Sequence, residues 1–174
     1  IDPSSGIVDE IIFGQVLQAG SGQAPARQVA LGSGLPESIP ALTINKVCGS
    51  SLKAVMLAAN SIRAGEYNVI IAGGMESMTN APHFAHKVSK TEYSDLRPTM
   101  IHDGLWDVYN DEHMGNTGEA VCNEFDISRQ QSDVFSVRSH TLAAHAWDSG
   151  WMEFETFTVG ELSQDEGIRA DTDL

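Results

Sequence analysis

The stretch "ALTINKVCGSSLKAVMLAANSIRAGEYNVIIAGG" (residues 41–74) decides the fold. Residues 40–47 start from a proline and are rich in β-branched residues, which favours a strand. A helical apolar pattern follows, and Gly65 is placed to end it. Residues 67–74 form a further short apolar run that finishes in a glycine pair. This order predicts a βαβ unit with parallel strands and a right-handed crossover. The helical pattern puts one set of residues on a common face: Leu52, Val55, Met56, Ala59 and Ile62.

Similar signals precede this unit, and a change of character follows it. Residues 8–14 read as an apolar strand that ends at a glycine, and residues 26–31 as a helix stopped by glycines and a proline. Residues 79–112 mix prolines, histidines, aromatics and charges without a sustained period. A segment of this length is too long for a passive connection, so we expect a functional or oligomer-forming role.

The C-terminal part reads as mainly helical. One helix is expected over residues 115–125. A second begins with a capping box, in which Ser128 is the N-cap and Gln131 the reciprocal partner, and runs towards Trp147. Residues 152–160 alternate between apolar and polar side chains, which predicts a strand.

Composition limits the classes of function. The chain has 174 residues, of which 41% are hydrophobic and 20% charged, as expected for a globular protein. Its formal net charge of −14 argues against nucleic acid or anionic membranes as partners. No apolar run reaches the length of a membrane span, and the opening "IDPSSGIVDE" carries no secretory signal. Two cysteines outside any metal-binding spacing favour a reducing compartment, so we expect a cytoplasmic protein or, alternatively, a mitochondrial one.

Cys48 stands where a strand gives way to a helix. At the first turn of a helix a thiol faces unpaired backbone N–H groups and the positive end of the helix dipole, which favour the nucleophilic thiolate. Gly49, Ser50 and Ser51 leave room for an acyl group and for an oxyanion near the amides. Free cysteines are also among the most buried residues, so this stretch alone favours a core thiol without settling the question.

Longer motifs carry a resemblance. The stretch from Thr43 to His83, with its "AGGMESM" turn, resembles the N-terminal domain of the thiolases, and within them the acetyl-CoA acetyltransferases. "VLQAGSGQAPARQVAL", "HMGNTGEAV" and "ISRQQSDVFSVRSH" occur in the family's order, so the resemblance covers essentially the whole chain. It implies an α/β thiolase-like fold, with a mostly parallel sheet and packed helices over residues 1–78. A partial α-rich loop domain is expected over residues 79–174.

The resemblance also assigns roles. It implies that Cys48 is the catalytic nucleophile that forms an acyl-thioester intermediate, and that His113 and Met114 line the acyl and pantetheine pocket. Coenzyme A thioesters, acetyl-CoA and acetoacetyl-CoA, would be substrates, with no separate cofactor and no metal. The family's activating histidine, oxyanion asparagine and second cysteine have no counterpart in this sequence, which resembles an N-terminal fragment. The resemblance further implies a homodimer or homotetramer that acts in fatty acid metabolism.

The other candidate residues are expected to be structural. The resemblance makes Glu76 a hydrogen-bonding residue near the site, and Cys122 reads as a packed helix residue. His83 and His86 with Asp95 offer no third ligand at a useful spacing, which favours a loop over a metal site. A degradative 3-ketoacyl-CoA thiolase and a non-catalytic thiolase-like protein that binds acyl-CoA remain alternatives.

Overall fold

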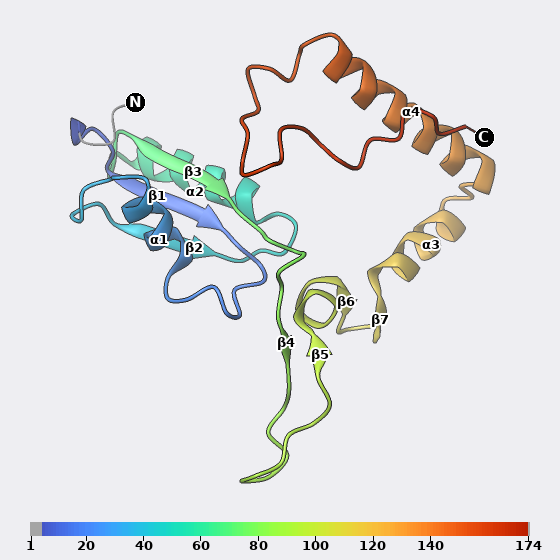
Figure 1. The fold of residues 1–174 in the computed structure, drawn as a ribbon, viewed down its shortest axis with the longest axis horizontal. Coiled ribbons are helices and arrows are strands. Elements are labelled where there is room, and N and C mark those ends of the chain that lie inside the picture. Colours follow the sequence, from blue (N-terminus) through green and yellow to red (C-terminus); the bar gives the residue numbers. More distant parts are fainter. Residues whose placement is uncertain (1–4, 174) are drawn as a thin grey trace. The chain divides into compact units, whose positions relative to one another are not determined.

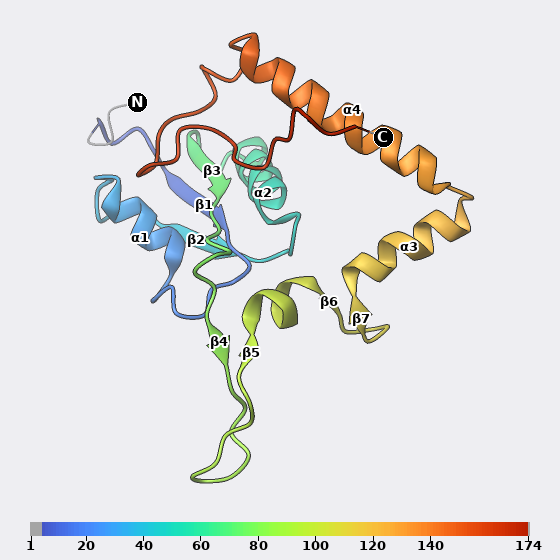
Figure 2. The ribbon, with the colours of Figure 1, turned by 45° about the vertical axis from the view of Figure 1, so that its right-hand side comes forward.

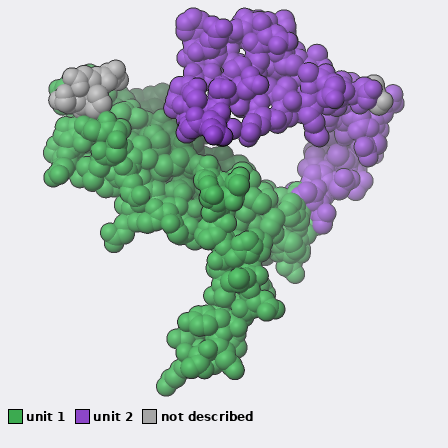
Figure 3. All heavy atoms as spheres, viewed as in Figure 1, with its two compact units in different colours: residues 1–114 green, residues 115–174 purple. Residues whose placement is uncertain are grey.

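The computed structural model describes residues 5–173 and divides the chain into two compact units, one ending at Met114 and the other beginning at Gly115 (Figure 3). The first unit contains a three-stranded parallel sheet in the order β2-β1-β3 (Figure 1). The strands are β1 (Glu10–Gly14), β2 (Ala41–Ile44) and β3 (Ile70–Gly74). Helix α1 (Pro25–Gly32) links β1 to β2, and α2 (Ser50–Ala64) links β2 to β3. The α/β fold and the expected parallel βαβ unit over β2, α2 and β3 are therefore confirmed. The connection from β1 through α1 to β2 is a second one.

The two helices cover opposite faces of the sheet. Successive residues of a strand point to opposite sides of the sheet, and two successive residues of β1 pack against different helices. Ile11 of β1 is buried in a cluster with Ala30 of α1. Its neighbour Ile12 is buried with Ala54 and Ala58 of α2. Figure 2 shows α1 and α2 on either side of the strands. Each helix contributes alanines to this packing, which lets the helix backbone lie close to the sheet.

The apolar face of α2 recognised in the sequence is exposed, and the buried face is a different one. Ala54 is fully buried, whereas Leu52 is 68% exposed. The periodicity therefore located the helix but not the side that packs on the sheet. Val55, Met56 and Ile62 are exposed with Leu52. Gly65 ends the helix as expected, with φ +76°, a left-handed conformation that glycine adopts without steric penalty.

Asp9 links the N-terminal ends of the neighbouring strands β1 and β3 by hydrogen bonds. Its carboxylate accepts hydrogen bonds from the backbone N–H groups of Asn68 (2.7 Å) and Val69 (2.9 Å), which lead into β3. The N–H of Asp9 in turn donates to the carbonyl of Val69 (2.8 Å). These two hydrogen bonds stabilise the charged carboxylate and therefore hold the pKa of Asp9 below its ordinary value. The bond from Val69 N–H has the larger effect and the bond from Asn68 N–H the smaller one.

The irregular segment has short elements of its own. Strands β4 (His83–Phe84) and β5 (Arg97–Pro98) pair antiparallel, as do β6 (Trp106–Asp107) and β7 (Glu112–His113). A π-helix, Met100–Leu105, lies between β5 and β6. The first compact unit ends at Met114, so the whole of residues 79–112 belongs to the same unit as the sheet. The family-type domain boundary at 78/79 stays a prediction.

The second unit is helical. Helix α3 runs Met114–Glu124 and α4 runs Arg129–Asp148. The expected capping box is present: Gln131 N–H donates to the Ser128 hydroxyl (3.2 Å), and Ser128 N–H donates to Gln131 Oε1 (2.7 Å). Across the described part of the chain, no helix has both the length and the apolar character of a membrane span.

The predicted strand over residues 152–160 is wrong. This segment consists of turns, and its one β-bridge is local, between Val159 and Leu162. Thr156 donates its hydroxyl proton to the carbonyl of Met152 (2.7 Å), which closes one of the turns. A strand needs a neighbouring backbone to pair with, and within residues 5–173 this segment pairs only with its own continuation. Alternation alone was therefore insufficient evidence.

Candidate active site

Cys48 lies at the junction of β2 and α2, and its side chain is exposed. Gly49 is the N-cap of α2, so the cysteine immediately precedes the helix. The carboxyl ends of β1 and β3 meet at the same edge of the parallel sheet. A cavity of about 330 Å³ opens there. Its lining comes from three chain segments: Gly14 to Val16, Val47 to Ser51 without Gly49, and Gly74 to Glu76.

Two glycines let the first turn of α2 lie against this edge. A Cβ on Gly14 would lie 2.6 Å from Cβ of Ser50 and 2.8 Å from its carbonyl carbon. A Cβ on Gly74 would collide with the Ser51 hydroxyl and lie 3.0 Å from the Gly14 carbonyl oxygen. Side chains at either position would push the helix start away from the strands. Gly74 therefore permits the close packing of α2 on this edge of the sheet.

The turn before the cysteine holds a residue in an unusual conformation. Val47 has φ +48°, in the left-handed region, where a β-branched side chain is disfavoured by roughly 1–3 kcal/mol. Two side chains bond to this turn. Asn45 Oδ1 accepts from Val47 N–H (2.9 Å). The Ser50 hydroxyl accepts from Lys46 N–H (2.9 Å) and donates to the Val47 carbonyl (2.6 Å).

Glu76 faces the same cavity, and its carboxylate has two backbone donors. Its Oε2 accepts from Val16 N–H (2.8 Å) and its Oε1 accepts from Leu17 N–H (3.1 Å). These bonds join the segment after β3 to the segment after β1, 59 to 60 residues apart in sequence. The expected structural hydrogen-bonding role of Glu76 is confirmed.

Gln15 was missed from the sequence. It is 8% exposed and lines the Cys48 cavity as well as an adjoining one of about 280 Å³. Its Nε2 donates to the hydroxyl of Ser21 (2.9 Å) and, at 3.4 Å, to the carbonyl of Leu17. A polar residue directly after a glycine is usually interpreted as part of a solvated loop. The one signal for burial of Gln15 was its position directly after the predicted apolar strand. Asn45 and Ser50 were also missed as residues that hydrogen-bond the turn before Cys48.

The other predicted residues lie outside the lining of this cavity. His113 is the last residue of β7, where it pairs with Trp106, and Met114 is the first of α3 and 43% exposed. Their role in an acyl pocket therefore stays a prediction. Cys122 lies within α3 and is half-buried.

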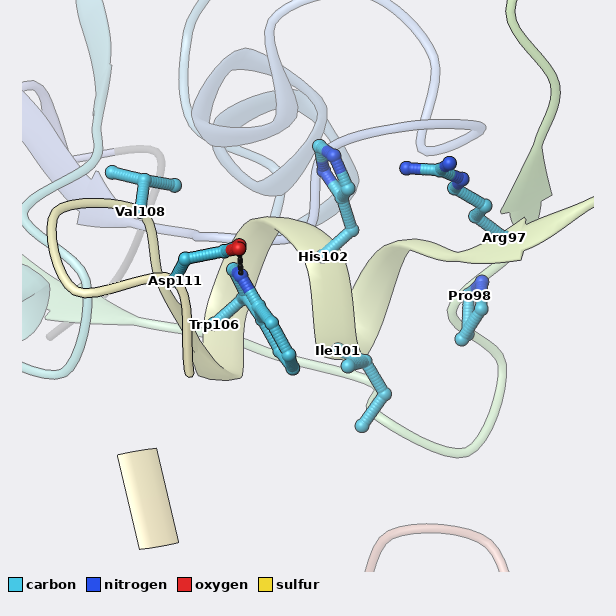
Figure 4. A pocket seen from close by; sticks show the side chains of 7 residues that line it. All are labelled: Arg97, Pro98, Ile101, His102, Trp106, Val108 and Asp111. Atoms are coloured by element: carbon cyan, nitrogen blue, oxygen red, sulfur yellow. Dashed lines mark hydrogen bonds between the residues drawn. The ribbon is translucent and has the colours of Figure 1, made fainter. Parts of the chain in front are cut away.

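A larger cavity, of about 440 Å³, is lined by residues of β5, the π-helix, β6 and the turn after β6 (Figure 4). Arg97 and His102 contribute the basic groups of its wall, and the Trp106 indole donates to Asp111 Oδ1 (3.1 Å). His102 Nδ1 lies 2.6 Å from Asp103 Oδ1. The lining includes no cysteine, serine or lysine that could serve as a nucleophile. The Cys48 cavity is therefore the stronger candidate for covalent chemistry.

The expected loop histidines lie near aromatic neighbours. His83 and Phe84 form β4, and the rings of Phe84 and His86 pack edge to face with centroids 5.0 Å apart. Among the residues that the structure describes, no three His, Cys, Asp or Glu side chains gather closely enough to ligate a metal ion.

Comparisons with known proteins agree on one family. The family model described as "Thiolase, N-terminal domain" matches residues 1–174. An acetyl-CoA acetyltransferase of Cupriavidus necator is 52% identical over 155 residues, covering 87% of this chain and 39% of the relative. A mitochondrial acetyl-CoA acetyltransferase of Xenopus laevis is 50% identical over 154 residues, covering 87% of this chain and 36% of the relative.

A solved structure gives the same result. A thiolase of Ascaris suum, crystallised in complex with coenzyme A, matches with a TM-score of 0.87 at 35% identity. The match covers 94% of this chain and 44% of that one. The chain thus spans less than half the length of these relatives.

Proposed function

Since the chain belongs to the thiolase family through its N-terminal domain, we propose that the protein carrying it is an acetyl-CoA C-acetyltransferase with Cys48 as its nucleophile. The reaction joins two acetyl-CoA molecules into acetoacetyl-CoA and free CoA, and runs in reverse as thiolysis. One observation carries this proposal: the exposed thiol of Cys48 opens into the cavity at the start of α2. The acetyl-CoA acetyltransferases among the similar proteins support the choice of substrate.

In the first half-reaction the Cys48 thiolate attacks the carbonyl carbon of acetyl-CoA. A bond forms between Cys48 Sγ and that carbon, the bond from the carbon to the CoA sulfur breaks, and CoA leaves as a thiolate that takes up a proton. The N–H of Ser50 donates to the Val47 carbonyl, but the other N–H groups at the first turn of α2 lack intrahelical partners and can stabilise the oxyanion formed on the way. The product is an acetyl group held as a Cys48 thioester.

In the second half-reaction a base removes the α-proton of another acetyl-CoA. The resulting carbanion attacks the Cys48 thioester, which forms the new carbon–carbon bond and releases the cysteine thiolate. Glu76 is unsuited to be this base, because both its carboxylate oxygens already accept backbone hydrogen bonds. The base is therefore a group other than Glu76. His113 and Met114 are proposed to line the acyl and pantetheine path.

Assembly and location are further parts of the proposal. A homodimer or homotetramer is supported by the apolar side chains exposed on the hairpin between β4 and β5, namely Val88, Tyr93 and Leu96. Coenzyme A thioesters serve as substrates without a separate cofactor. A cytoplasmic location is proposed, and a mitochondrial one is the alternative, given the mitochondrial Xenopus relative.

The test is thiolysis of acetoacetyl-CoA by the full-length protein. Cys48→Ser should reduce the rate at least a thousand-fold, because a hydroxyl cannot replace the thiolate in covalent catalysis. Cys122→Ser is the matched control and should retain the wild-type rate. A series of 3-ketoacyl-CoA substrates decides against the degradative alternative if the four-carbon substrate is preferred. Binding of acetyl-CoA without turnover would instead identify a non-catalytic thiolase-like protein.

A further inference from the structure

We propose that Ser50 and Asn45 are positioning residues, which hold Val47 in its left-handed conformation and thereby fix where the Cys48 thiol lies. The inference deepens the proposed function and rests on it for its catalytic meaning. Its structural content concerns only the turn between β2 and α2, and it can be tested separately through the reactivity of the thiol.

The first step of the argument is the conformation of Val47. L-amino acids with a branched Cβ rarely adopt positive φ, and such residues persist only where surrounding bonds over-determine them. Val47 has φ +48° and is 44% exposed, so core packing does not enforce this conformation. Hydrogen bonds to the turn must supply most of the restraint.

The second step is the set of bonds. Asn45 Oδ1 accepts a hydrogen bond from the N–H of Val47 (2.9 Å), and the Ser50 hydroxyl donates one to the Val47 carbonyl (2.6 Å). Both backbone groups of the strained residue are therefore bonded to side chains. Ser50 also accepts from Lys46 N–H (2.9 Å), and Ser50 N–H donates to the same Val47 carbonyl (3.1 Å).

The third step links the turn to the sheet. Ser50 is 5% exposed and lies against Gly14, which leaves its hydroxyl little freedom to turn elsewhere. Ser50 thus packs against Gly14 of β1 and hydrogen-bonds to Val47, the residue directly before Cys48. Without its hydroxyl, Val47 should relax towards negative φ, and the peptide that carries Cys48 should rotate with it.

The experiment compares Ser50→Ala with Ser33→Ala in the full-length protein. Ser33 makes the same kind of bond, from its hydroxyl to the carbonyl three residues earlier (Ala30, 2.9 Å), but on α1. We measure the rate at which iodoacetamide alkylates Cys48, the kcat and KM for thiolysis, and thermal unfolding. Ser50→Ala should lower kcat and alkylation by about ten- to a hundred-fold, as misplacement of a reacting group does. Ser33→Ala should leave both unchanged.

Rescue distinguishes positioning from a general loss of structure. Glycine adopts positive φ without steric penalty, so Val47→Gly in the Ser50→Ala background should restore much of the lost alkylation and kcat. Asn45→Ala should show the same defect and the same rescue. Unchanged reactivity in Ser50→Ala, or a defect that Val47→Gly leaves untouched, would overturn the inference. If Cys48→Ser keeps full activity, the proposed function fails, while the alkylation rates still decide the positioning claim.

Discussion

The carboxylate of Glu76, just beyond β3, accepts a hydrogen bond from the backbone N–H of Val16, just beyond β1, at 2.8 Å. The same carboxylate accepts from Leu17 N–H at 3.1 Å. A single side chain thus joins two loops that line the Cys48 cavity. A glutamate beside a nucleophile invites assignment as a general base, but its oxygens are already engaged with the backbone.

Glu76→Gln should therefore act on stability more than on chemistry. The amide retains one acceptor oxygen but turns N–H donors towards a backbone donor, which should lower the free energy of unfolding by about 1–2 kcal/mol. Urea unfolding measures this effect, with Glu37→Gln as an exposed control. The rate of Cys48 acylation should fall only a few-fold. A loss of about 10²–10⁴-fold would mean that Glu76 acts in proton transfer.

Gly14→Ala should destabilise the first unit. The new methyl group would lie 2.6 Å from the Ser50 side chain and 2.8 Å from its carbonyl carbon, so the start of α2 must shift. Overpacking of this kind lowers the free energy of unfolding by about 1–3 kcal/mol. Gly32→Ala is the control, since its added Cβ meets nothing within 4 Å. Equal stability of the two variants would show that the approach of α2 to β1 is not tight.

Asp9→Asn should destabilise the protein in a pH-dependent way. The pKa of Asp9 is lowered in the folded state, so its contribution is fully present above the ordinary value of 3.8 and is lost as pH falls through the folded pKa. The difference in Tm between wild type and variant should be largest near neutral pH and shrink below that value. Thermal melts from pH 7 to pH 2 measure it. A difference that stays constant with pH would contradict the assignment.

The hairpin between β4 and β5 should contribute to oligomer assembly. Val88, Tyr93 and Leu96 are 67%, 65% and 69% exposed, and three large apolar side chains exposed on one hairpin favour a contact surface. Replacing all three with serine should lower the mass of the full-length protein in sedimentation equilibrium and leave the folded sheet intact. Phe154→Ser is the control, as Phe154 is 96% exposed outside the hairpin. An unchanged mass would place the contacts elsewhere.

Local sequence signals predicted the elements around Cys48 but not the contacts between them. Periodicity and glycine position identified α2 and its end at Gly65, because those features depend on neighbouring residues alone. The buried face of α2 depends on how closely the helix approaches the sheet, which favours Ala54 and Ala58 over the larger Leu52. Single-helix periodicity carries no information about that distance.

The turn that contains Val47 also shows that local sequence patterns do not predict specific contacts. Asn and Ser near a helix start predict some side chain-to-backbone bonding, but not which backbone group receives it. The strand predicted over residues 152–160 failed because pairing is a property of two segments, whereas alternation is a property of one. Cys48 itself was undecided from its local sequence, and the family resemblance separated a nucleophile from a core thiol. Its exposure is consistent with the nucleophile.

The most direct test of the account is acid-quenched mass spectrometry of the full-length protein after brief incubation with acetyl-CoA. The account predicts one acetyl group, located by peptide mapping on the fragment that contains Cys48, and lost on addition of free CoA. Cys122 should stay unmodified, and Cys48→Ser should carry no adduct. An active wild-type enzyme that shows no Cys48 adduct, or that carries the acetyl group on another residue, would contradict the central claim.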